Sequence, residues 1–233
     1  GRAGTDNATA FRLLNTLVML GYVEKISGTR SFRLTLKCLD LGFHAIARAD
    51  LRTLARPVLR GLVGETNEAA SIGVLEGADV LYIERIQAGL TRLGVEIRIG
   101  SRVPVYSTAI GHAILGFLPR ETQIRVLESR PRPQLTEHTP VALDVLLRRL
   151  DHVRAQGFAL SDQETVSGLR VLSAPVLDPD GFPVAGLSVA APAFRMPLDA
   201  FEQAACRPVL EAARTLARAL QAAGGVAVQT AHS

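Results

Sequence analysis

The segment GSRVPVYSTAIGHAILGFLP, residues 100–119, combines the signals of an extended strand with those of a buried helix. Pro104 fixes its own φ and favours extended geometry at Val103, while the hydroxyl of Ser107 or Thr108 can cap a first helical turn. Apolar side chains then recur at helical spacing, at Ile110, Ala113, Ile114, Phe117 and Leu118. We therefore expect a strand that leads directly into a core helix, which stops at the end of this segment.

The first turn of this helix is a candidate anion site. It consists of Ala109, Ile110 and Gly111, whose backbone N–H groups lie at the positive end of the helix dipole. Gly111 has no side chain that would keep a carboxylate or a phosphate away. The alternative is an ordinary capped core helix, and this segment taken by itself favours that alternative.

Length and composition indicate a globular protein. The chain has 233 residues, of which 48% are hydrophobic and 21% are charged, enough for one large domain or for a small and a medium one. No apolar run reaches the ~18 residues of a membrane-spanning helix, and no signal peptide is visible, so we expect a cytoplasmic protein without membrane association. Cys38 and Cys206 have neither CxxC nor metal-ligand spacing, and no metal or other cofactor is expected.

The net charge is concentrated at the N-terminal end. Residues 1–37 hold six basic and two acidic side chains, and this surplus of four equals the net charge of the whole protein. The rest of the chain carries 20 side chains of each sign. A short basic module joined to an electrically balanced body is typical of a protein that contacts nucleic acid at one end. A solvated basic surface is the alternative.

This N-terminal module should form a helix and a hairpin. Residues 8–20 contain neither Pro nor Gly, and Gly21 follows as a stop signal. The inward side of the helix is expected to hold Ala10, Leu13, Leu14 and Leu17. The other side is small, polar and basic, as suits close approach to DNA. Residues 22–26 and 30–34 predict two strands joined by Ser27-Gly28-Thr29, which together would form the wing of a winged helix-turn-helix.

Residues 8–42, ATAFRLLNTLVMLGYVEKISGTRSFRLTLKCLDLG, resemble the recognition helix, wing and linker helix of the IclR family of bacterial transcriptional regulators. The family pattern combines a small-residue helix start, RLL, LxxLGYV and a wing that ends in YRL. The resemblance implies a winged helix-turn-helix DNA-binding domain over residues 1–37, N-terminally truncated, and a linker helix over 36–50. The candidate DNA-binding residues are Asn7, Ala8, Thr9, Arg12, Asn15, Lys25, Arg30 and Arg33.

The remaining chain alternates strand pairs and helices. The patterns predict helices over residues 51–65, 142–156 and 196–220, and strands over 69–76, 79–86, 92–99, 158–160, 168–177 and 184–191. Asp178-Pro179-Asp180-Gly181 is a strong turn signal between the last two strands. This order indicates an α+β domain with an antiparallel sheet.

Two segments of this part resemble the IclR effector domain. GSRVPVYSTAIGHAIL is similar to the family's GSxLPxxxTAxGKALL. GFALSDQETVSGLRVLSAPVLDPDGFPVAGLSVAAP, which begins at Gly157, is similar to GYAxDDEExxxGxRCIAAPVxDxxGxVVAALSVSGP. The resemblance implies a GAF-like or profilin-like effector-binding domain over residues 51–222, followed by a flexible tail over 223–233.

The resemblance also implies an effector pocket. In the family it is formed by the start of the helix after GSxLP, the DDEE turn and inward positions of the last hairpin. Carried over to this sequence, the positions are Ala109, Ile110, Gly111, Ser161, Val171, Ser188 and Ala190. Ser188 and Ala190 share one face of a strand. The family's acidic residue, cysteine and serine are replaced here by Ser161, Val171 and Ala190, which predicts a pocket less polar than one built for glyoxylate or pyruvate. His112 stands where lysine is usual.

Three further positions resemble the branch of the family that regulates aromatic-acid catabolism, of the protocatechuate and hydroxybenzoate type: Tyr106, Ser107 and Gln163. We hypothesise a small organic acid, with an aromatic acid as one candidate, whose carboxylate binds the N–H groups of residues 109–111. Its body would lie against Val171 and Ala190, with Tyr106 in the same site. Alternatively, the serines satisfy backbone groups and the apolar residues are plain core.

The sequence therefore predicts a ligand-responsive DNA-binding transcriptional regulator. Its partners would be double-stranded operator DNA, a small organic acid and a second copy of the chain in a homodimer, with a homotetramer as an extension. A dimer suits half-sites about one DNA turn apart, ~34 Å. One alternative is a metabolite-sensing or protein-interaction module without DNA binding. A hydrolytic enzyme is disfavoured because the chain has no HExxH, GxSxG or phosphate-loop motif.

Overall fold

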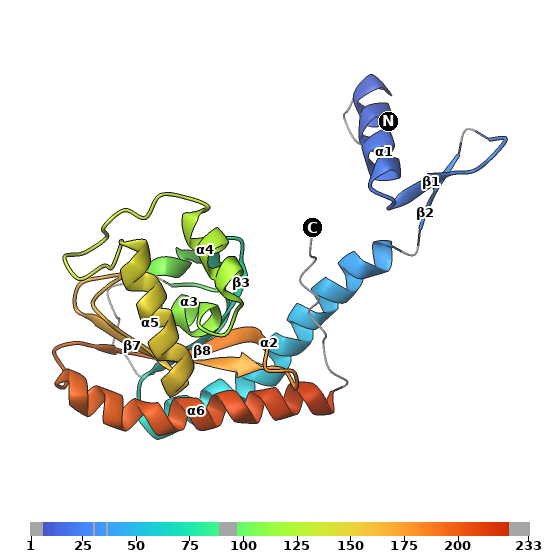
Figure 1. Ribbon diagram of the computed structural model, residues 1–233. Coiled ribbons are helices and arrows are strands. Elements are labelled where there is room, and N and C mark those ends of the chain that lie inside the picture. Colours follow the sequence, from blue (N-terminus) through green and yellow to red (C-terminus); the bar gives the residue numbers. More distant parts are fainter. Residues whose placement is uncertain (1–6, 30, 36, 89–96, 224–233) are drawn as a thin grey trace. The chain divides into compact units, whose positions relative to one another are not determined.

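The chain separates into two compact units, residues 1–50 and 51–233, which are described in turn (Figure 1). The computed structural model describes residues 7–29, 31–35, 37–88 and 97–223, with the side chains of all of these except residues 7 and 38–50. Residue 30, most of the strand expected over 92–99 and nearly all of the expected tail lie outside the described residues. In the described part, no helix has the length and apolar character that a membrane span needs.

The first unit consists of a helix followed by a hairpin, as predicted. Helix α1 (Asn7–Met19) leads through Gly21, with φ 77°, to the antiparallel strands β1 (Val23–Lys25) and β2 (Phe32–Leu34). Two side chains beyond β2 tie the hairpin to the end of α1. The Thr35 hydroxyl donates to the Gly21 carbonyl at 2.6 Å, and Lys37 Nζ donates to the Leu20 carbonyl at 2.9 Å.

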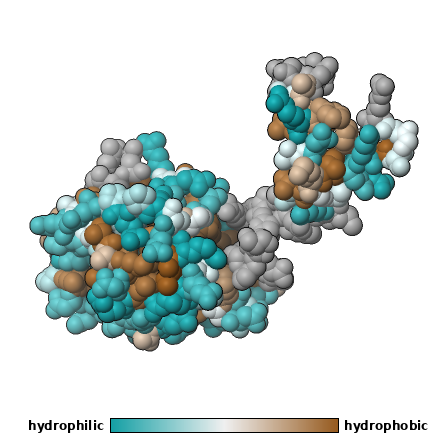
Figure 2. Space-filling model, turned by 45° about the horizontal axis from the view of Figure 1, so that its top comes forward, coloured by the Kyte–Doolittle hydropathy of each residue, from teal (hydrophilic) through white to brown (hydrophobic). Residues whose placement is uncertain are grey.

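The inward side of α1 differs from the expectation. Leu13 and Leu17 were expected to face inward, but they are 58% and 39% exposed. The hairpin packs on one side of α1, where Ala10, Leu14 and Val18 are half-buried at helical spacing. Apolar side chains outside this stripe therefore reach the surface of the unit, where Figure 2 shows brown, hydrophobic atoms.

One long helix replaces the two that were expected over residues 36–50 and 51–65. Helix α2 runs without a break from Cys38 to Thr66, and Pro57 lies inside it on the exposed side. The buried stripe of its second half consists of Leu51, Ala55, Leu59 and Leu62. This 4-4-3 spacing holds the helix against the sheet of the second unit on both sides of the proline, because burial of the stripe outweighs the missing backbone N–H.

The second unit is built on a six-stranded antiparallel sheet of order β5-β4-β3-β8-β7-β6. The strands are β3 (Ala69–Glu76), β4 (Asp79–Ile86), β5 (Arg102–Pro104), β6 (Ala159–Asp162), β7 (Leu169–Leu177) and β8 (Pro183–Pro192). The expected hairpins and the α+β class are confirmed. The short strand β5 pairs with β4, whereas the described residues 97–99 of the expected strand are not extended in the sheet.

Helices cover both faces of this sheet (Figure 1). On one face α2 and α6 (Leu198–Ala222) bury a core that includes Leu59, Ile72, Leu172, Leu187 and Phe201. On the other face lie α3 (Ala109–Leu115), α4 (Arg120–Glu128) and α5 (Leu143–Gln156), which bury a separate apolar cluster. We call this second side the α3 face.

Helix α3 ends earlier than predicted. It stops at Leu115 and not near Leu118, and the unpredicted α4 follows. Side chains from neighbouring helices take up the carbonyl groups at this end. Gln123 Nε2 donates to the carbonyls of Leu115 and Leu118 at 2.9 and 3.1 Å, and Arg154 Nε donates to Gly116 at 2.6 Å. These donors replace the next turn of intrahelical hydrogen bonds.

Two glycines let α3 approach the sheet closely. Gly73 of β3 and Gly186 of β8 lie opposite each other in the sheet. A Cβ atom on Gly186 would lie 2.8 Å from Ile110 Cγ2 and 3.2 Å from the Ile110 carbonyl oxygen. A Cβ atom on Gly73 would lie 2.5 Å from Val80 Cγ1. The glycine pair therefore forms the hollow in which the first turn of α3 sits.

Substitution of Gly186 should weaken the fold measurably. We expect Gly186→Ala to lower the free energy of unfolding by about 1–3 kcal/mol, because Ile110 has no room to move away from the added methyl group. Gly64→Ala on the exposed side of α2, where nothing lies within 4 Å of the added atom, is the control and should stabilise by about 0.4–1 kcal/mol. Urea unfolding measures both, and a Gly186→Ala variant as stable as the parent would contradict this packing.

Candidate functional site

The start of α3 is capped as the sequence predicted. Thr108 has extended geometry, with φ −109° and ψ 140°, and its hydroxyl accepts a hydrogen bond from the Gly111 N–H at 3.1 Å. A single 3₁₀ turn, η1 (Val105–Ser107), comes just before it. Every residue of α3 is buried. The helix is therefore a central core element of the second unit.

Gly111 was expected to leave room for a carboxylate or a phosphate at the start of α3, and this expectation is wrong. A Cβ atom at this position would lie 2.2 Å from the Val105 carbonyl oxygen and 2.7 Å from Val105 Cα. The missing side chain therefore makes room for the backbone of η1 and not for an incoming anion. The Gly111 N–H is also already used by Thr108. Since α3 has seven residues, its short dipole adds little attraction for an anion.

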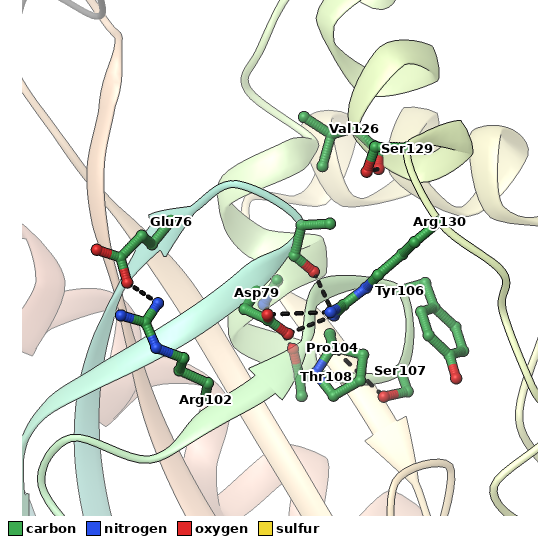
Figure 3. A network of polar contacts seen from close by, with 12 residues as sticks. Glu76, Asp79, Arg102, Pro104, Tyr106, Ser107, Thr108, Val126, Ser129 and Arg130 are labelled. Carbon is green, nitrogen blue, oxygen red and sulfur yellow. Dashed lines mark hydrogen bonds and ion pairs between the residues drawn. The ribbon is translucent and has the colours of Figure 1, made fainter. Parts of the chain in front are cut away.

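A network of polar contacts holds the segment that precedes α3 (Figure 3). Arg130 makes two hydrogen bonds to the Asp79 carboxylate and one, at 2.8 Å, to the Ala78 carbonyl. Arg102 of β5 pairs with Glu76 of β3 across the intervening strand β4. These charge-assisted contacts fix the β3–β4 turn against the chain that enters η1.

Tyr106, a predicted effector contact, has a structural hydrogen bond. Its ring is buried, and its hydroxyl donates to the Pro133 carbonyl oxygen at 2.6 Å. Burial also raises the pKa of Tyr106, with the charges of Arg130 and Arg132 opposing the rise. The Tyr106 hydroxyl therefore binds the segment that follows α4.

The strands bring together three of the predicted effector residues. Ser161 lies opposite Val171, and Val171 lies opposite Ala190, on the adjacent strands β6, β7 and β8. Residues in register on neighbouring strands project to the same face of a sheet. Gly186 on β8 faces α3, and residues two and four positions further along the strand face the same way. Ser161, Val171, Ser188 and Ala190 therefore all lie on the α3 face, where Ala109 and Ile110 also pack.

A second row on this face was not predicted from the sequence. Ala159, Ser173, Ser188, Ser71 and Arg85 lie opposite one another in turn on β6, β7, β8, β3 and β4. The Ser173 hydroxyl donates to the Leu187 carbonyl at 2.9 Å, and Arg85 Nη1 donates to Ser71 Oγ at 2.9 Å. The three serines are buried. We call these five residues the serine row.

His112 is a buried neutral histidine. It is 0% exposed, and its Nε2–H donates to the Tyr106 carbonyl at 2.6 Å, which leaves Nδ1 as an acceptor without a partner. Burial, together with the positive charge of Arg149, lowers the pKa of His112 to about 4. A neutral imidazole here can accept a hydrogen bond but cannot pair with an anion.

A buried carboxylate also faces Arg149. Arg149 Nη1 donates to Glu164 Oε1 at 2.5 Å, whereas Glu164 Oε2 is buried without a hydrogen-bond partner. Burial raises the pKa of Glu164, and Arg149 opposes the rise. Ser161 lies near enough to lower this pKa slightly. Two buried acceptor atoms without a partner among the described residues, His112 Nδ1 and Glu164 Oε2, thus lie near the Arg149 side chain at the β6 end of the α3 face.

Threonine hydroxyls hold the loop that carries Glu164. Thr136 donates to the Gln163 carbonyl at 2.7 Å, Thr139 to the Glu164 carbonyl at 2.6 Å, and Thr165 to the Ser107 carbonyl at 2.5 Å. Gln163 has φ 60°, a strained value for a residue other than glycine. Two of these hydrogen bonds reach backbone carbonyls of the loop, and the third runs from the loop to the last residue of η1. Together they fix the loop beside η1.

Sequence models of two protein domains match the chain. "Bacterial transcriptional regulator IclR C-terminal" matches residues 43–218, and "IclR helix-turn-helix domain" matches residues 2–27. The chain belongs to the IclR family of bacterial transcriptional regulators. The family prediction is confirmed, and the N-terminal unit of this IclR-family protein carries the family's helix-turn-helix sequence.

Relatives and solved structures agree with this assignment. The regulator KdgR of Escherichia coli K12 is 36% identical over 194 residues, which cover 83% of this chain and 73% of KdgR. A transcriptional regulator of Rhodococcus sp. RHA1 has a crystal structure that matches with a TM-score of 0.72 at 34% identity, over 93% of this chain and 86% of that one. The inducer-binding domain of PobR from Acinetobacter, a double mutant crystallised with 3-hydroxybenzoic acid, matches with a TM-score of 0.65 at 26% identity, over 71% of this chain and 96% of that domain. These relatives are regulators, which confirms that this IclR-family chain is not an enzyme.

The predicted DNA-contacting residues lie mainly on the surface of the first unit. Ala8, Arg12, Asn15 and Lys25 are exposed, and Thr9 is half-buried. Arg33 is exposed and its Nε donates to Glu24 Oε1, opposite it in the wing, at 2.5 Å. Arg30 and the side chain of Asn7 lie outside the described residues.

Sequence reasoning predicted Ser188 but missed Ser71, Ser173 and Arg85 of the serine row, and it missed the role of His112. Arg85 lies in the strand sequence YIERI, where alternation marks a half-buried strand but does not say what lies opposite. The pairing of Ser71 with Arg85 depends on the β3–β4 register, which includes an irregularity at Ile72 and Gly73. A bulge shifts the cross-strand partner of every later residue by one position, and no pattern in the sequence shows where it occurs.

The low pKa of His112 predicts an acid-sensitive fold. The unfolded chain takes up a proton near pH 6.5, whereas the folded state does so near pH 4. The free energy of unfolding should therefore fall as the pH drops from about 6.5 to 4, by up to about 3 kcal/mol from this group. His112→Gln keeps a donor for Tyr106 but does not titrate, so its stability should depend less on pH in this window.

Chemical denaturation between pH 4 and 7.5 tests this expectation. His152→Gln, at an exposed position of α5, is the matched control and should keep the pH dependence of the parent protein. Equal slopes for the parent and His112→Gln would contradict this expectation, because they would show that His112 takes up its proton at the same pH in the folded and the unfolded chain.

Proposed function

We propose that this protein is a transcriptional regulator that binds operator DNA through residues 1–37 and a small organic acid on the α3 face of its effector-binding domain. The single observation that carries the ligand proposal is the arrangement of Ser161, Val171 and Ala190 in register on three adjacent strands, with Ser188 beside them. Buried hydroxyls next to apolar side chains suit a small ligand with one polar end and an apolar body.

We propose an aromatic acid as the first candidate among these ligands. The apolar side chains of Val171 and Ala190 would contact a ring better than they would contact a second polar group. PobR, whose inducer-binding domain has the same fold, was crystallised with 3-hydroxybenzoic acid. Short keto acids are the second candidate, because the serine hydroxyls supply additional hydrogen-bond donors. Ala109, Ile110 and Tyr106 would border the pocket, and Gly111 would shape it by holding η1.

For DNA recognition we propose that α1 enters the major groove. Arg12 and Asn15 lie on its exposed side, where they can donate to bases and phosphates. Ala8, Thr9 and Asn7 at the start of α1 would allow close approach. Lys25, Arg30 and Arg33 on the wing would contact the phosphate backbone.

The assembly that we propose is a homodimer. The linker helix, residues 36–50, would connect each DNA-binding domain to the effector-binding domain over 51–222. Two recognition helices would then reach half-sites about one DNA turn apart, ~34 Å, and two dimers could join as a tetramer. Ligand binding would change operator affinity by favouring one of two arrangements of these helices. This activity belongs in the cytoplasm, where bacterial DNA lies.

A thermal-shift screen against hydroxybenzoates and short keto acids tests the ligand proposal. A ligand at 100 times its Kd should add ~2.7 kcal/mol to the free energy of unfolding. Ser188→Leu should abolish this shift because the larger side chain fills the space beside Ala190, and Ala204→Leu on the exposed side of α6 should not. Circular dichroism checks that both variants fold. An unchanged shift in Ser188→Leu would contradict the site.

Salt-dependent binding to duplex DNA tests the second half of the proposal. DNA selected from a random-sequence library by the whole chain serves as the probe in fluorescence anisotropy. Arg12→Ala should weaken binding and reduce the slope of log K against log salt by about 1. Arg125→Ala, at an exposed position of α4, should leave the slope unchanged. Failure to select any DNA would favour the alternative of a sensing module that acts through a protein partner.

A further inference from the structure

We propose that Arg85 is the anchor for the carboxylate of the effector, with the hydroxyls of Ser188 and Ser71 as its neighbours. This inference rests on the proposed function, because it assumes an acidic ligand on the α3 face. It assigns the charge recognition to β4, at the opposite end of the serine row from Ala159, and not to the first turn of α3.

The contacts of Arg85 differ from those of Arg130, Arg149 and Arg170, which are also half-buried. Arg132 is half-buried too, and its guanidinium group donates to the backbone carbonyls of Leu127 and Val141. Arg85 Nη1 donates to Ser71 Oγ, whereas its Nε is buried and has no hydrogen-bond partner among the described residues. Within the described part of the chain, no carboxylate pairs with its guanidinium group. By contrast, Arg130, Arg149 and Arg170 each pair with a carboxylate. Burial lowers the pKa of Arg85, with the nearby Tyr82 as an opposing cause.

A partly buried cation without a counter-ion is costly for the fold. The cost of taking a charge out of water is offset when an opposite charge or several hydrogen bonds replace the water. Arg85 has one side-chain hydrogen bond to a neutral hydroxyl. A bound carboxylate would supply both the missing charge and an acceptor for Nε, in the paired geometry that guanidinium groups favour.

The register of the sheet places suitable partners beside Arg85. Ser71 lies opposite Arg85 on β3, and Ser188 lies opposite Ser71 on β8. Side chains opposite each other on neighbouring strands have Cβ atoms about 4.5–5.5 Å apart. The Ser188 hydroxyl makes no hydrogen bond to a described residue, so it is available as a donor. One carboxylate oxygen can therefore accept from Arg85 and the other from Ser188.

The body of the ligand then has a defined direction. Ala190 lies two residues beyond Ser188, which corresponds to about 7 Å along the strand. Val171 lies opposite Ala190 and Ser161 lies opposite Val171. A ligand held by its carboxylate between Arg85 and Ser188 would place a ring-sized apolar body over Ala190 and Val171. A hydroxyl at its far end would meet Ser161.

The experiment compares charged ligands with their neutral amides. The probes are 3-hydroxybenzoate, 4-hydroxybenzoate and pyruvate, each beside its carboxamide, measured by isothermal titration and thermal shift on the whole chain. We expect any acid that binds to lose at least about tenfold in affinity in Arg85→Met, in line with the loss of a charged hydrogen bond. Arg85→Lys should retain part of the affinity. The amides should bind the parent protein at least about tenfold more weakly than the acids.

Arg149→Met is the matched control. Arg149 is also half-buried and lies on the same face, but it pairs with the buried Glu164. Without ligand, Arg149→Met should melt at a lower temperature than the parent protein, because it leaves the buried Glu164 carboxylate unpaired. Arg85→Met should melt at the same temperature as the parent or higher, because it removes a cation that pairs with no carboxylate of a described residue.

The outcomes separate this inference from the proposed function. If an acid binds the parent and Arg85→Met equally, or binds no better than its amide, the anchor is not Arg85 although the protein senses an acid. If no acid binds the parent, the proposed ligand class fails and the ligand-free melting temperatures decide. A melting temperature of Arg85→Met several degrees below that of the parent would then show that Arg85 is structural, and would overturn the inference. A melting temperature of Arg85→Met equal to or above that of the parent would support the inference that Arg85 is held ready for an anion and is not needed for the fold.

Discussion

The close contact between α3 and the central sheet is the constraint on which the second unit depends. Gly73 and Gly186 lie opposite each other in the two central strands, and Ile110 fills the hollow that they leave. A Cβ atom on Gly186 would collide with Ile110 of the helix, and one on Gly73 would collide with Val80 of β4. The same approach requires glycine at position 111, where the Val105 backbone packs. Three glycines thus define the distance at which α3 covers the sheet, and with it the space beside the serine row.

Strand β4 carries charge toward both faces of the sheet. The buried Glu84 faces α2 and accepts from Arg52 at 3.0 Å, while the next residue, Arg85, faces α3 and donates to Ser71. Consecutive residues of a strand point in opposite directions, so this arrangement follows from the pleat. On the α2 face the buried charge is paired. On the α3 face, the guanidinium group of Arg85 pairs with no carboxylate of a described residue.

Some of the residues on the α3 face could be predicted from the sequence. The family motifs led to Ser161, Val171, Ser188 and Ala190, and the structure places all four on one face. Their role in binding stays a prediction. Arg85 and Glu164 were missed because the residues that face them come from segments distant in sequence. His112 was noticed as a departure from lysine, but its buried, neutral state follows from contacts with Tyr106 and Arg149 that no spacing predicts.

The sequence by itself determined most of the elements, their order and the family, but it did not show α4. Strand alternation, the Thr108 cap and the turn at residues 178–181 are local signals, which can be read from residues close together in the sequence. Tertiary structure decided the rest. It merged two expected helices into α2, ended α3 at Leu115 through side chains of Gln123 and Arg154, and left Leu13 and Leu17 exposed. It also selected which buried charges have partners, because pairing depends on strand register and on helix packing between residues far apart in the chain.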